Sequence, residues 1–307
     1  MKLKFTSLFI ALSMVTGIFA GAGSSQTSLK GSYPIVLSHG MFGWGANDTN
    51  SIIGIMQYWG GLDDYLFSQG AVVYAPGKSA LQSNAYRANE LKTKINLFMA
   101  SGGYSKVHII GHSQGGLDSR YMVANLGMKS KVSTLTTLST PHYGSPVADI
   151  VLTVVPSWLM PYVSTALNAL VNVIWGGNKN NLKASLESLT TANAAAFNAS
   201  TPNQSGVKYY SYGSKVTVPD LIQHPMMGLL VPVTGIGGVV KGQGASNDGL
   251  VPLTSAKWGT WKGSPNYGFF TTGLDHLEVS NTLHMGETWF DVKGFWMAMA
   301  LNAKNNQ

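Results

Sequence analysis

Short apolar segments alternate with helix-like segments along the first half of the chain. The apolar segments are typical of buried strands and lie at residues 33–40, 71–76, 107–113 and 132–141. Residues 83–103 instead carry apolar side chains every three or four positions and end on two glycines, as helices often do. This alternation predicts an α/β fold, with a mostly parallel central sheet and helices on both of its faces.

The third of these strands runs directly into a glycine-flanked serine. The pentapeptide Gly111-His112-Ser113-Gln114-Gly115 fits the pattern G-x-S-x-G, and residues 114–126 have helical spacing. Glycines permit a turn that is too tight for side chains on both flanks, and the serine hydroxyl is presented at its tip. The strand before and the helix after the turn indicate a nucleophile elbow.

A serine becomes a strong nucleophile only when a histidine takes its proton and a carboxylate orients that histidine. In an elbow of this type the acid and then the histidine follow the serine along the chain. Asp248, in GASNDGLVP, and His276, in GLDHLEVSN, satisfy that order. Asp220, in VPDLIQHP, is the competing acid, but it lies farther from the histidine, where a turn or a cation-ligand role is equally open.

Two backbone N–H groups are expected to form the oxyanion hole. One follows the serine and belongs to Gln114; the other comes from the early loop LSHGMFGW, which begins at the end of the first strand. Met41 is the expected donor on that loop, with Phe42 as the next choice. Of the other histidines, His108 and His112 are expected to be packed, neutral imidazoles.

The N-terminus has the pattern of a secretory signal peptide. Lys2 and Lys4 precede the uncharged residues 5–20, and cleavage is expected after Ala22. The apolar stretch is shorter than the roughly 20 residues that span a bilayer. Removal of residues 1–22 leaves 285 residues, which is within the size of a single catalytic domain at 23–307.

Charge and composition narrow the possible partners. The formal net charge is +7, and loss of Lys2 and Lys4 leaves +5, dispersed without a basic cluster, so no nucleic-acid partner is expected. The absence of cysteine excludes a thiol nucleophile and a thiolate metal site. The segment PGKS at 76–79 is not a phosphate-binding loop, because Val72 stands where that motif requires glycine.

Residues 150–178 carry no charge and resemble a membrane span, but Pro156 and Pro161 interrupt them. A helix of about 15 residues starting at Pro161 has an apolar face. It is either an ordinary core helix or a mobile flap that covers a site in water and turns toward lipid at an interface.

Five motifs in order resemble one known family. VLSHGMFGW, GHSQGGLDSRY, STPHYGSP, SNDGLVP and DHLEVSN are together similar to the secreted bacterial triacylglycerol lipases of the Pseudomonas and Burkholderia type. The resemblance runs from about residue 33 to the histidine loop. It implies an α/β-hydrolase fold, hydrolysis of acylglycerols at a lipid–water interface, and Ser113, Asp248 and His276 as the catalytic triad with Met41 and Gln114 as oxyanion donors.

The resemblance also implies features outside the triad. It favours an amphipathic lid, inserted at about residues 146–180, and a structural calcium ion, for which Asp220 and Glu278 are the candidate ligands. The loop HLEVSN is one residue shorter than is usual in the family and offers Glu278 where the family has aspartate. Many relatives use a dedicated foldase, which is therefore a possible partner, and many have a disulfide that this chain lacks.

Two other functions remain open from the sequence. One is a carboxylesterase for soluble short-chain esters, in which the helix after Pro161 is fixed core. The other is a lipid- or surface-binding protein that retains the fold with an inactive site.

Overall fold

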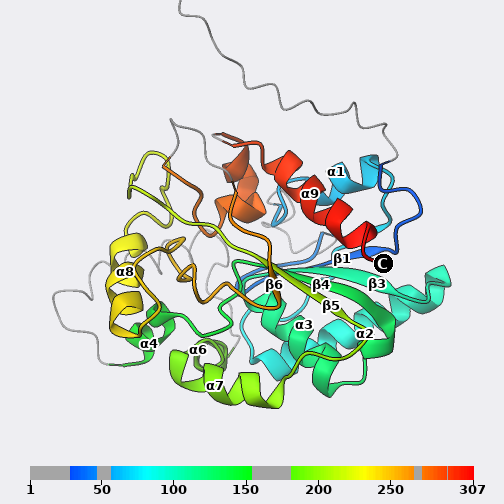
Figure 1. The fold of residues 1–307 in the computed structure, drawn as a ribbon, viewed down its shortest axis with the longest axis horizontal. Helices are drawn as coiled ribbons and strands as arrows, with labels where there is room; N and C mark the ends of the chain where they lie inside the picture. Colours follow the sequence, from blue (N-terminus) through cyan, green and yellow to red (C-terminus); the bar gives the residue numbers. More distant parts are fainter. Residues whose placement is uncertain (1–27, 47–56, 154–180, 266–271, 289) are drawn as a thin grey trace, which may run out of the picture.

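The computed structural model describes residues 28–46, 57–153, 181–265, 272–288 and 290–307. These residues form one parallel β-sheet with helices packed around it (Figure 1). Six strands pair in the order β2-β1-β3-β4-β5-β6, and every pair is parallel. The strands are β1 (Ile35–Ser38), β2 (Val73–Tyr74), β3 (Val107–His112), β4 (Val132–Leu138), β5 (Lys208–Tyr212) and β6 (Thr260–Trp261). The predicted α/β fold with a parallel sheet is confirmed.

Helices lie on both faces of this sheet. Figure 1 shows α1 (Leu62–Ser68) and α9 (Val292–Lys304) above it, and α2 (Asn84–Gly102) and α3 (Gln114–Asn125) below it. The remaining helices are α4 (Pro146–Leu152), α6 (Leu182–Glu187), α7 (Thr191–Ser200) and α8 (Leu230–Val240), with 3-10 helices η2 (Lys129–Lys131), η3 (Glu278–Ser280) and η4 (Thr282–Thr288). No described helix is long and apolar enough to cross a membrane.

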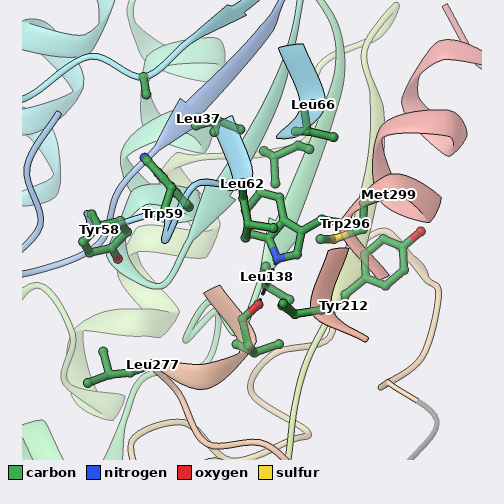
Figure 2. Close-up of a cluster of buried hydrophobic side chains, with 14 of the residues drawn as sticks. Leu37, Tyr58, Trp59, Leu62, Leu66, Leu138, Tyr212, Leu277, Trp296 and Met299 are labelled. Atoms are coloured by element: carbon green, nitrogen blue, oxygen red, sulfur yellow. Dashed lines mark hydrogen bonds between the residues drawn. The ribbon is translucent and has the colours of Figure 1, made fainter. Parts of the chain in front are cut away.

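The strands β1, β3 and β4 are buried along their whole length because both faces of the sheet are covered. Successive side chains point to opposite faces, so Ile110 packs in the α1 and α9 core, whereas its neighbour Ile109 packs in the α2 and α3 core. In the first core, Trp296 is fully buried, lies 5.5 Å from the Trp59 ring and donates to Val279 O at 2.9 Å (Figure 2). Replacing such a tryptophan with alanine typically costs about 3–5 kcal/mol of stability.

The long helix α2 starts and ends where its sequence predicts. The Ser83 side chain caps its first turn by accepting the Tyr86 N–H, and Gly103 ends it at φ 67°, a left-handed conformation that favours glycine. The strands β5 and β6 were not predicted; β5 has the sequence KYYSY, whose mixture of tyrosine, serine and lysine lacks a continuous apolar pattern. The signal peptide and the helix expected after Pro161 lie outside the described residues.

Candidate active site

Ser113 occupies a sharp turn between β3 and α3. Its backbone is at φ 55° and ψ −132°, a conformation that is strained for a residue with a side chain. The two glycines of the motif are required by close backbone contacts. A Cβ on Gly115 would lie 2.1 Å from Ser38 O, and one on Gly111 would lie 2.8 Å from the Gly116 Cα. The turn therefore closes only with glycine at these positions, as the elbow interpretation predicts.

The structure brings Asp248 and His276 together, although 27 residues separate them along the chain. His276 Nδ1 lies 2.9 Å from Asp248 Oδ2, and both side chains are buried. The carboxylate also accepts the backbone N–H groups of Leu250 and Val251 through its other oxygen, at 3.1 and 2.8 Å. A carboxylate can only accept, so Nδ1 carries the ring proton and Nε2 has a free lone pair when the ring is neutral.

Ser113 and His276 line the same cavity. His276 Nε2 is buried and makes no hydrogen bond with any described residue, which leaves it able to accept a proton from a group in this cavity. The cavity wall is mostly apolar and includes Met41, Phe42, Pro141, Val147, Ala148, Val151, Leu186, Leu189, Leu250, Val251 and Leu277. An apolar chain attached to a reacting carbonyl would be in contact with apolar side chains there.

The two expected oxyanion donors are placed on either side of the serine. Gln114 is the first residue of α3, where a backbone N–H has no partner within the helix. Met41 lies on the loop after β1, and within the described part of the chain no acceptor is found for the N–H of either residue. Phe42, the second choice on that loop, donates its N–H to Ala80 O at 3.0 Å. Met41 is thus the better candidate of the two.

A buried ionic cluster beneath the loop was not predicted from the sequence. Asp118 Oδ2 accepts from Lys78 Nζ at 2.7 Å and from Arg87 Nε at 2.8 Å, and all three side chains are inaccessible to solvent. Arg87 also donates to the carbonyls of His39 and Gly40, at 2.8 and 2.9 Å, and Lys78 donates to His39 O. Because the C=O and N–H of a trans peptide point in opposite directions, the bond to Gly40 O also sets the direction of the Met41 N–H.

The buried cluster lowers the pKa values of two of its basic groups, Lys78 and His39. Burial, followed by the neighbouring Arg87 guanidinium, lowers the pKa of Lys78 to about 7, against the opposing attraction of Asp118. Burial, followed by the charges of Lys78 and Arg87, lowers the pKa of His39 well below its ordinary value. His39 is therefore neutral, and its Nε2 accepts the Lys78 backbone N–H at 3.0 Å. The PGKS segment thus holds the loop after β1 in place through Lys78.

The candidate calcium ligands are not brought into one group. Asp220 accepts the Ile222 backbone N–H at 2.8 Å and is absent from the cluster of potential ligands around Glu278, which consists of His224, Asp275 and Glu278. Glu278 Oε2 accepts from His224 Nδ1 at 2.9 Å and from the Asp275 N–H at 2.7 Å.

Both ring nitrogens of His224 have hydrogen-bond partners. Nδ1 lies 2.9 Å from Glu278 Oε2, and Nε2 lies 2.7 Å from the hydroxyl oxygen of Thr272, which itself donates to Gln223 Oε1. Calcium prefers six to eight oxygen ligands, and a ring nitrogen already occupies Glu278 Oε2. The described residues therefore do not fit a calcium ion held by Asp220 and Glu278.

Asp275, the third member of this cluster, carries the remaining polar atom. Its Oδ1 accepts the N–H groups of Leu277 and Glu278, whereas Oδ2 is buried without a partner among the described residues. Burial, and then the charge of Glu278, raise the pKa of Asp275 well above its ordinary value. Nothing in the sequence indicated a role for His224 or Asp275, because a histidine before proline and an aspartate beside a histidine are common in loops.

The parallel sheet, the serine elbow at the carboxyl end of β3 and the buried aspartate–histidine pair together define an α/β hydrolase. A family model described as the alpha/beta hydrolase fold matches residues 33–226, and the chain belongs to that family.

Within the family, the chain belongs with the bacterial triacylglycerol lipases. It is 32% identical to the triacylglycerol lipase of Vibrio cholerae, over 82% of this chain and 84% of that protein. It is 30% identical to the triacylglycerol lipase of Pseudomonas fragi, over 84% of this chain and 91% of that protein. Among solved structures, the Staphylococcus hyicus lipase superposes with a TM-score of 0.63 at 19% identity, over 92% of this chain and 98% of that chain, which shows the shared fold.

Proposed function

We propose that this protein is a secreted lipase that hydrolyses triacylglycerol esters through an acyl-enzyme on Ser113. The observation that carries the proposal is the buried His276–Asp248 pair, whose free Nε2 lines one apolar cavity with Ser113. The resemblance to triacylglycerol lipases over most of the chain gives it independent support.

In the first half of the proposed reaction, Ser113 Oγ attacks the ester carbonyl carbon while His276 Nε2 takes the hydroxyl proton. Negative charge then develops on the carbonyl oxygen, where the N–H groups of Met41 and Gln114 donate hydrogen bonds. Collapse of this intermediate breaks the bond to the glycerol oxygen, which leaves as the alcohol after taking the proton from His276.

In the second half, water attacks the acyl-enzyme and His276 takes its proton. The Ser113 ester bond breaks, the fatty acid leaves, and the proton returns to Ser113 Oγ. Throughout, Asp248 stabilises the imidazolium that forms and keeps Nδ1 protonated. Each step uses only the residues named and one water molecule.

The apolar wall of the cavity supports an acyl chain as the group that binds beside Ser113. Val147, Ala148 and Val151 come from α4, and Leu186 and Leu189 from the region of α6, so the two helices form one side of the site. These helices flank residues 154–180, which lie outside the described residues and contain most of the expected lid. Interfacial activation is part of the proposal and rests on the sequence.

The test is fatty-acid release from an emulsified triacylglycerol by the protein beside its Ser113→Ala variant. We expect release by the native protein and loss of at least about 10³-fold in the variant. A folded native protein that releases no fatty acid from the emulsion would contradict the lipase proposal.

A carboxylesterase for soluble short-chain esters is the alternative, and the same cavity would serve it. Rate measured against substrate concentration across the solubility limit separates the two functions. A lipase of the proposed type gains rate when the ester forms a second phase, whereas the esterase reaches its maximum before that point.

Export and assembly complete the proposal. N-terminal sequencing of the protein released by a bacterial host is expected to begin at residue 23, because residues 1–22 have the signal pattern. Refolding from urea with and without a lipase foldase would determine whether this chain needs that partner.

A further inference from the structure

A chain of three buried hydrogen bonds joins the oxyanion loop to the loop of the catalytic histidine. The Gly40 N–H lies 2.8 Å from the Tyr58 hydroxyl, which lies 2.7 Å from His112 Nδ1. His112 Nε2 in turn lies 2.9 Å from the backbone carbonyl of His276. Gly40 immediately precedes Met41, and His112 immediately precedes Ser113, so these hydrogen bonds connect the backbone beside Met41, Ser113 and His276.

The direction of each hydrogen bond follows from the chemistry of its ends. The His276 carbonyl can only accept, so His112 Nε2 carries the ring hydrogen. If the ring is neutral, Nδ1 is an acceptor and takes the Tyr58 O–H, and the tyrosine oxygen accepts from the Gly40 N–H. All three bonds therefore point the same way, from the oxyanion loop to the carbonyl of the catalytic histidine.

Burial keeps this direction fixed. His112 is fully buried and Tyr58 is 5% exposed. Burial, with a smaller contribution from His276, lowers the pKa of His112 well below its ordinary value, and burial raises the pKa of Tyr58. Both side chains stay neutral at ordinary pH. Neighbouring aromatic rings hold Tyr58 in place: the Trp59 ring, which Figure 2 shows beside Tyr58, lies 4.7 Å from it between centroids. The Trp44 ring lies at 5.6 Å.

The space around the serine is also tight. A Cβ on Gly40 would lie 2.6 Å from the Ser113 Cβ and 3.0 Å from the Tyr58 hydroxyl, and the rings of His112 and His276 are 4.7 Å apart. A shift of either loop by a few tenths of an ångström would therefore change the position of a donor or of the base relative to Ser113. Small misplacements of this kind can cost up to about 10²-fold in rate.

We propose that Tyr58 and His112 are positioning residues that fix the oxyanion loop and the catalytic-histidine loop relative to each other across Ser113. The proposal rests on the proposed function. Neither side chain exchanges a proton with the substrate; each acts through the backbone that it binds, at Gly40 and at His276. The prediction that His112 is a packed, neutral imidazole agrees with this role, because the neutral ring joins Tyr58 to the His276 carbonyl.

The first test uses Tyr58→Phe, which removes the hydroxyl and keeps the ring. Tyr209→Phe is the matched control, because the buried Tyr209 hydroxyl also accepts a backbone N–H, from Gln204 at 3.0 Å, but Tyr209 does not line the cavity. Steady-state hydrolysis of a soluble p-nitrophenyl butyrate is measured for both variants, together with the urea midpoint of unfolding.

For Tyr58→Phe we expect kcat to fall about 10-fold with KM within about two-fold of the native value, and no such fall in Tyr209→Phe. A kcat within two-fold of native for folded Tyr58→Phe would overturn the proposal. An equal fall in both variants would also overturn it, since it would reflect lost stability rather than positioning.

Variants of His112 test the two ends of the chain separately. His112→Gln keeps a donor near the Nε2 position, and His112→Asn keeps an acceptor near the Nδ1 position, whereas His112→Ala keeps neither. We expect the rate of serine phosphonylation by a p-nitrophenyl phosphonate to fall about 10-fold in each amide variant and about 100-fold in His112→Ala. Equal rates in all three variants would contradict the proposal.

Native protein and Ser113→Ala are run alongside these variants. Native protein that hydrolyses neither the soluble ester nor an emulsion would remove the proposed function, and the positioning proposal with it. Native activity that Tyr58→Phe and His112→Ala leave intact would remove the positioning proposal alone.

Discussion

Removing the buried Asp118 carboxylate should lower the free energy of unfolding more than removing a charge from the protein surface. Asp118→Asn keeps the shape of the side chain but deletes the carboxylate that, among the described residues, is alone in forming ion pairs with Lys78 and Arg87. Breaking a buried ion pair by removing one partner typically costs about 3–5 kcal/mol, because the other charge remains buried without compensation.

The structure places the expected cost near the lower end of that range. Lys78, with its pKa of about 7, is mostly uncharged at pH 8 even with the carboxylate present, so Arg87 is the cation that loses its partner. The guanidinium still donates to four backbone carbonyls, at Ser79, Ala80, His39 and Gly40. We therefore expect Asp118→Asn to lower the free energy of unfolding at pH 8 by about 3 kcal/mol.

Lys78→Met should cost less, about 2 kcal/mol at pH 8, because it leaves the Arg87–Asp118 pair intact and removes two hydrogen bonds, to His39 O and to Asp118 Oδ2. Glu187→Gln is the control, since its ion pair with Lys183 is exposed and is expected to contribute under about 1 kcal/mol. The assay is urea unfolding at pH 8, followed by tryptophan fluorescence and by circular dichroism. A larger loss for Lys78→Met than for Asp118→Asn would refute this account of the cluster.

Three further predictions concern the site and its surroundings. Asp248→Asn should lower kcat by on the order of 10³–10⁴-fold with little change in the urea midpoint, because it removes the group that orients His276, as measured by ester hydrolysis. Chelation with EDTA should leave activity and melting temperature unchanged, whereas His224→Ala should lower both, because the His224 ring holds Glu278; inactivation by EDTA that calcium restores would contradict this. Between pH 6.5 and pH 4, the titration of His108 alone should lower the free energy of unfolding by about 3 kcal/mol. Burial lowers the pKa of His108 to about 4, so in that range only the unfolded chain binds the proton; urea midpoints of native protein and His108→Gln measure the difference.

The local parts of the site could be predicted because the chain folds them from neighbouring residues. The elbow at Ser113 needs a strand, a turn with glycines and a helix, and all three are contiguous in the sequence. Candidates for its partners, Asp248 and His276, followed from the order that this elbow requires. The choice between Met41 and Phe42 needed the structure, because it depends on which N–H is already bonded to Ala80.

The parts that could not be predicted depend on contacts between distant residues. Lys78 and Asp118 are charged, and charged side chains usually lie on the surface, so nothing in the sequence indicated that they meet in the interior. His224 reaches Glu278 across 54 residues and occupies its carboxylate, which the shortened loop alone did not reveal. The strand β5 was missed because neighbouring strands, rather than its own side chains, specify its pairing.

Covalent trapping would show whether Ser113 is the nucleophile of this hydrolase. The protein is treated with a p-nitrophenyl alkylphosphonate, and the intact mass and the labelled peptide are determined by mass spectrometry, with His276→Ala as the comparison. We expect one adduct per chain, on Ser113, formed far more slowly in His276→Ala. A folded protein that forms no adduct, or that carries the label on a different residue, would contradict this expectation.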